Sequence, residues 1–133
     1  MARPMKSFVD PLLRSGRGAF ALTNARTNRV VARTVLTAFD SASRRRGLLE
    51  HESLDESTAL IIAPSNAIHT FSMRFPIDVA FVSRAGQIVK VSPAVAPWRI
   101  AASWRGFAVV ELPAGALAAS DTRQGDWLEV TGP

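Results

Sequence analysis

Cysteine is absent from this chain of 133 residues, and histidine occurs only twice. Without cysteine there are no disulfides, thiolate nucleophiles or thiolate metal sites, which fits a reducing compartment. The two histidines form no His-x-x-x-His pair of the kind that holds zinc, so the sequence implies no metal and no cofactor. Long apolar runs are missing as well, because no segment approaches the ~20 residues that a membrane span needs.

The composition is that of a soluble globular protein, with 47% hydrophobic and 20% charged residues. A chain of this length can bury about two-thirds of its unfolded surface, which is enough for one core. We expect a mobile basic arm over residues 1–17 and a single domain over residues 18–133. In the arm, Asp10 and Pro11 interrupt the apolar residues, so no signal-peptide core forms. We therefore expect a cytoplasmic protein.

Positive charge is concentrated in the N-terminal third of the chain. Residues 1–46 hold ten Lys or Arg against two acids, whereas residues 47–133 hold six against nine. Such a segment most often forms a solvated surface. The alternative is weak, non-specific binding of nucleic acid or another anionic surface. That alternative predicts that five arginines line one face: Arg14, Arg17, Arg26, Arg29 and Arg33.

Short strands separated by turn residues dominate the pattern, and crossover helices are missing. The expected strands cover residues 19–22, 30–35, 59–63, 77–82, 87–91, 107–112 and 127–130. Gly86 is expected to take a left-handed conformation in a hairpin, and Asp40 to cap one helix, Ser41–Leu49. The fold class is therefore mainly β, a single-domain β-sandwich or partly closed barrel with one short α-helix. Residues 92–105 read as a long loop whose Trp98 and Trp104 serve as core plugs rather than a ligand-facing lid.

The run from Ile68 to Asp78 is the most informative segment. If it is extended, His69, Phe71 and Met73 share one face. A histidine on an apolar face is more often a hydrogen-bonded core residue than a catalyst, which favours a structural role. Ligand contact, proton transfer and metal binding remain as alternatives for His69.

Two carboxylates lie among apolar residues, Asp78 after the motif and Glu111 in a later strand. A buried carboxylate needs partners, and Arg46, Arg74 and Arg105 are the available cations. We expect structural ion pairs, joined in one polar cluster. The candidate ligand-binding residues are Arg46, His69, Thr70, Met73, Arg74, Asp78 and Glu111.

These residues predict a small binding module for an unknown small ligand or protein. An enzyme using the same residues, hydrolase-like or metal-assisted, is the alternative. A hydrolase would need Ser65 within about 3 Å of His69, whereas four residues of strand span ~13 Å. A hard cation would require His69 to converge with Asp78, Glu111 and Asp126. We assign no catalytic residue.

Five segments appear in the order and spacing of a known family. They are Arg45 to Leu49, Pro64 to Thr70, Met73 to Phe81, Glu111 to Gly115, and Gly125-Asp126. The chain thus resembles the DUF192 family over residues 20 to 130, and is most similar to the branch that reads Ile-His-Thr-x-x-Met-Arg-Phe-Pro-Ile-Asp. The resemblance implies a compact, mainly β domain and no assigned activity. Many members of that branch have cysteine where this chain has Ser65, so thiol chemistry is excluded here.

Overall fold

The computed structural model describes residues 7–15, 19–46 and 54–132. Within them, three sheets and three short helices form a mainly β fold. The helices are α1 (Asp10–Ser15), α2 (Ser41–Arg46) and α3 (Ala116–Ala119). The strands are β1 (Ala21–Asn24), β2 (Arg29–Ala32), β3 (Thr34–Ala38), β4 (Thr58–Ile62), β5 (Ala67–His69), β6 (Ile77–Val82), β7 (Ile88–Val95), β8 (Ile100–Ala102), β9 (Ala108–Pro113) and β10 (Leu128–Thr131). The predicted sandwich-like class is confirmed, and the sheets do not close into a barrel.

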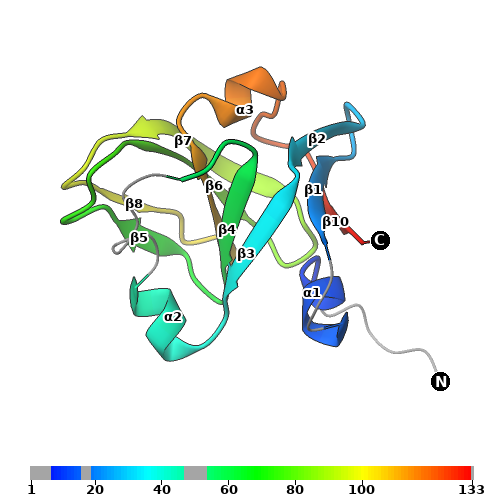
Figure 1. The fold of residues 1–133 in the computed structure, drawn as a ribbon, viewed down its shortest axis with the longest axis horizontal. Helices are drawn as coiled ribbons and strands as arrows, with labels where there is room; N and C mark the ends of the chain where they lie inside the picture. Colours follow the sequence, from blue (N-terminus) through cyan, green and yellow to red (C-terminus); the bar gives the residue numbers. More distant parts are fainter. Residues whose placement is uncertain (1–6, 16–18, 47–53, 133) are drawn as a thin grey trace.

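The central sheet has the order β3-β4-β9-β6-β7. Every residue of β4 and β6 is buried, which explains their continuous apolar runs, because both faces of this sheet are covered. One face packs against the β10-β1-β2 sheet and α1. The other face packs against the two-stranded β5-β8 ribbon, on the opposite side of the molecule (Figure 1).

Strands β3 and β4 pair in parallel, with α2 in the connection between them. Among the described residues this is the one parallel strand pair, and the other pairs are antiparallel. Asp40 caps α2 as expected, since the backbone N–H of Ser43 donates to its carboxylate at 2.8 Å.

The hairpin of β6 and β7 is confirmed, and Gly86 has φ +107°. A Cβ at Gly86 would lie 2.7 Å from the carbonyl oxygen of Leu128. Glycine is therefore required twice here, by the left-handed backbone and by the close approach of β10.

Three other expectations are corrected. The described residues form three helices rather than one, because residues 10–15 form α1 and the small-residue tract after Pro113 forms α3. Residues 7–15 are not a free arm, since Phe8 and Val9 are buried in the core and precede α1. Residues 92–105 are not one loop, because β7 extends to Val95 and β8 pairs with β5.

Candidate functional site

The β5-β8 ribbon has one buried and one exposed face. In its antiparallel register Ile68 lies opposite Ala101, and His69 lies opposite Ile100. Side chains alternate along a strand, so Ile68 and Ala101 turn into the core while His69 and Ile100 turn outward. His69 is therefore exposed, and the expectation of a core histidine was wrong.

Aromatic rings continue the exposed face beyond the ribbon. The ring centroids of His69 and Phe71 are 5.0 Å apart, and those of Phe71 and Trp98 are 5.9 Å apart and stacked. Trp98 is 62% exposed and Ile100 is 70% exposed. We call His69, Phe71, Trp98 and Ile100 the aromatic face. Trp104, two residues past β8, is 87% exposed, so neither of these tryptophans is the core plug that we expected.

Hydrogen bonds of Thr70 fix the backbone that carries the aromatic face. It is fully buried, and its hydroxyl donates to the carbonyl of Ala96 at 2.7 Å and accepts from the backbone N–H of Arg99 at 2.8 Å. Its own backbone carbonyl accepts from the N–H of Trp98 at 2.9 Å. These bonds fix the turn at Trp98, which has φ +66°, beside Phe71. Thr70 thus positions the site and has no surface to offer a ligand.

The surroundings of the aromatic face are cationic. Residues 57–110 contain five Lys or Arg and a single carboxylate, Asp78, which is buried. The five cations are all exposed: Arg74, Arg84, Lys90, Arg99 and Arg105. This part of the chain therefore presents exposed positive charge beside exposed rings.

Asp78 is bound by backbone groups rather than by an arginine. Its carboxylate accepts from the N–H groups of Ala94 at 2.8 Å, Gly115 at 3.1 Å and Leu117 at 3.0 Å. These bonds join the end of β7 to the turn that leads into α3. Asp78 is a structural residue, as expected, but the ion pair expected for it does not appear among the described residues.

Glu111 is 3% exposed, and within the described part of the chain its Oε2 atom has no hydrogen-bond partner. Burial raises its pKa from 4.5 to about 7. In the register of β6 and β9, Glu111 lies opposite Val79 and Asp78 lies opposite Leu112. Adjacent positions face opposite sides of a sheet, so the two carboxylates point to opposite faces and the predicted cluster does not form.

The other predicted site residues are dispersed. Met73 is buried in the core, and Arg74 is exposed. The side chain of Arg46 lies outside the described residues. Sequence reasoning missed Phe71, Trp98 and Ile100 as site residues. The signal was the spacing of two residues between His69 and Phe71 and between Trp98 and Ile100, which places each pair on one face of a strand. The two pairs can be joined only once β5 is known to pair with β8.

In the described part of the chain, the residues named for the hydrolase and metal alternatives do not come together in one site. The hydroxyl of Ser65 donates to the carbonyl of Ala67 at 3.0 Å, and Asp78 is occupied by backbone amides. Among the described residues, no group of three or more His, Asp or Glu side chains is placed to hold a metal ion. The helices in this part of the chain are also too short or too polar to cross a membrane.

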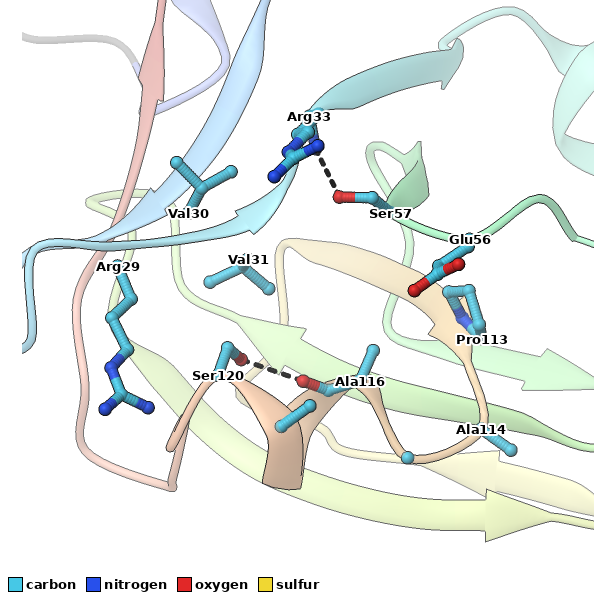
Figure 2. A pocket seen from close by; sticks show the side chains of 12 residues that line it. Arg29, Val30, Val31, Arg33, Glu56, Ser57, Pro113, Ala114, Ala116 and Ser120 are labelled. Carbon is cyan, nitrogen blue, oxygen red and sulfur yellow. Dashed lines mark hydrogen bonds between the residues drawn. The ribbon is translucent and has the colours of Figure 1, made fainter.

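A hollow of about 580 Å³ lies between β2, the turn before β4 and the start of α3. Figure 2 shows Arg29 and Glu56 on opposite sides of it, and Arg33 also lines it. Arg26 lies outside this hollow and is held by Asp126 at 2.7 Å. Arg26 is therefore paired away from the hollow that Arg29 and Arg33 line, and the side chains of Arg14 and Arg17 lie outside the described residues.

Comparison with solved structures shows the same fold in two proteins. One is a "putative transcription regulator" of Sinorhizobium meliloti 1021, with 22% identity, a TM-score of 0.74, and coverage of 85% of this chain and 92% of that one. The other is a protein of unknown function from Novosphingobium aromaticivorans DSM 12444, with 20% identity, a TM-score of 0.72, and coverage of 84% and 83%. No curated protein matches the sequence. The model of the family DUF192, "Uncharacterized ACR", matches residues 22–130, and the chain belongs to that family.

Proposed function

We propose that the protein is a small binding module that holds single-stranded nucleic acid on the aromatic face. The observation that carries the proposal is the row of neighbouring, exposed rings formed by His69, Phe71 and Trp98, of which the last two are stacked. Contiguous exposed apolar surface is uncommon in a soluble protein and marks an interaction site. Flat rings at a surface are suited to stacking with other flat rings.

The charge around the rings selects an anionic partner. Arg99 lies next to Trp98 in the chain, Arg105 next to Trp104, and both arginines are exposed. A cationic surface attracts phosphates by releasing their counterions. Rings for stacking and cations for phosphates are the two components that proteins use to bind single strands.

A single strand fits better than a duplex, because a duplex keeps its base faces stacked inside and offers only groove edges. The ribbon also presents rings rather than a helix that could enter a groove. Stacking accepts every base, so binding on this face would be weak and largely independent of sequence. The protein would thus distinguish single strands from duplexes rather than one base sequence from another.

Fluorescence anisotropy of a labelled twelve-nucleotide dT strand tests the proposal, with a duplex of the same length as comparison. Stacking contributes about 1–3 kcal/mol per base, so Trp98→Ala and Phe71→Ala should each weaken single-strand binding by roughly 5- to 150-fold. The affinity should also fall with salt, with a slope of about −0.7 for each phosphate contacted.

Trp127→Ala is the matched control. Trp127 is also an exposed tryptophan, at 46%, but it adjoins β10 rather than the ribbon. Its removal should leave strand binding unchanged. Equal binding of strand and duplex, or equal losses in the Trp98 and Trp127 variants, would contradict the proposal.

A further inference from the structure

A second hollow, of about 480 Å³, lies at the far end of the ribbon from Trp98. At that end Ala67 pairs with Ala102, and the backbone N–H of Ser103 donates to the carbonyl of Asn66 at 2.8 Å. Three segments supply its lining, namely the stretch after β4, the β6-β7 hairpin and the stretch before β9. The lining residues are Pro64, Ser65, Asn66, Arg84, Arg105, Gly106 and Phe107.

The lining contains two guanidinium groups and no carboxylate. In the part of the chain that the structure describes, neither Arg84 nor Arg105 has an acidic side chain within ion-pair distance. Arg84 instead lies over the ring of Phe107, with its guanidinium carbon 4.2 Å from the ring centroid. A guanidinium held on an aromatic face keeps its N–H donors available for an anion.

The backbone around the hollow is held by local hydrogen bonds. The N–H of Ser65 donates to the carbonyl of Phe107 at 2.8 Å, and the N–H of Gly106 donates to the carbonyl of Ser103 at 2.9 Å. A Cβ at Gly106 would lie 3.2 Å from that same carbonyl oxygen and 3.5 Å from Cα of Asn66. The turn that carries Arg105 is thus packed closely against the segment that carries Asn66.

We propose that this hollow binds a phosphate group. Guanidinium forks pair with phosphate oxygens through two parallel hydrogen bonds, and the side-chain amide of Asn66 is a further donor in the lining. The absence of a carboxylate in the lining removes the repulsion that an anion would meet in the hollow beside Glu56. The site goes beyond the proposed function: it shares Arg105 with the cationic surface proposed above, but it does not depend on the rings of the aromatic face.

The test is a titration of the full chain with inorganic phosphate at constant ionic strength, followed by proton–nitrogen correlation spectra. Saturable shifts should be confined to the Asn66 side-chain amide, the Gly106 N–H and the two arginine side chains. Arg84→Gln and Arg105→Gln should each weaken phosphate binding about tenfold or more. Both side chains are exposed, so the variants should fold, which thermal unfolding checks.

Arg29→Gln is the matched control, because it removes the same charge from an exposed arginine that lines the other hollow. It should leave the phosphate titration unchanged. Shifts that do not saturate, equal weakening in the Arg29 variant, or full binding in the double Arg84/Arg105 variant would overturn the proposal.

The salt dependence of dT-strand binding shows whether the site takes a phosphate of the strand or a free phosphate ion. If the double variant makes strand binding less dependent on salt concentration, the site takes a backbone phosphate of the strand. If that dependence is unchanged while the phosphate titration is lost, the site takes a free phosphate ion. Trp98→Ala should leave the phosphate titration intact, which separates a failure of this site from a failure of the aromatic face.

Discussion

Glu111→Gln should change how the stability of the protein depends on pH. The carboxyl group of Glu111 is buried on the face of the central sheet that carries Val79 and Leu60. Burial disfavours the charged form and raises the pKa from 4.5 to about 7. The folded protein therefore binds this proton more tightly than the unfolded chain does.

The sign and size of the effect follow from that difference. Well below pH 4.5 the group is protonated in both states, and its ionisation has no effect on stability. As the pH rises toward 7 the unfolded chain releases the proton first, so the free energy of unfolding decreases. Between pH 5 and pH 8 a pKa raised from 4.5 to about 7 removes roughly 2 to 3 kcal/mol of stability. Glutamine cannot ionise, so the variant should lack this loss.

Urea unfolding of both proteins at pH 5, 6.5 and 8, followed by tryptophan fluorescence, measures the difference directly. The stability of Glu111→Gln relative to the parent should increase by roughly 2 to 3 kcal/mol from pH 5 to pH 8. Glu129→Gln, at an exposed position of β10, controls for the loss of one negative charge. A difference between Glu111→Gln and the parent that stays constant across this range would refute the reasoning.

Three further substitutions test the framework. Asp78→Asn should destabilise the fold by roughly 3 kcal/mol, because the amide replaces an acceptor that serves three backbone N–H groups; a loss below 1 kcal/mol in urea unfolding would contradict this. Gly86→Ala should cost roughly 2 kcal/mol or more, because a positive φ is combined with a Cβ 2.7 Å from the Leu128 carbonyl; an unchanged thermal midpoint would refute it. Asp126→Asn should abolish an acid-sensitive contribution to stability. The guanidinium of Arg26 and the amide of Asn24 hold the pKa of Asp126 well below 3.8, so its stabilising effect is present above about pH 4 and lost as the pH falls below it. Acid titration of tryptophan fluorescence would show this, and an identical acid transition in the variant would disprove it.

Local signals predicted much of the framework. The hairpin at Gly86, the buried strand β4 and the opening hairpin of β1 and β2 all follow from alternation and turn residues. Such signals depend on neighbours within a few positions, so a single sequence contains them. The same holds for the Asp40 cap of α2.

The candidate site was harder to predict, because its parts are distant in sequence. The motif after His69 is not one extended strand, since β5 ends at His69 and the chain turns. Phe71 is therefore exposed while Met73 is buried, although alternation predicted that both lie on one face. Tertiary bonds from Thr70 to the turn before β8 override the local pattern.

The sequence by itself determined the family, the mainly β class and the positions of most strands. Only the tertiary structure decided which side chains share a surface. The register of β6 and β9 sends Asp78 and Glu111 to opposite faces, and a shift of one residue would have reversed them. The pairing of β5 with β8 brings Trp98 beside Phe71. Whether an aromatic side chain fills a core or faces water depends on what packs over it, and long-range strand pairing decides that.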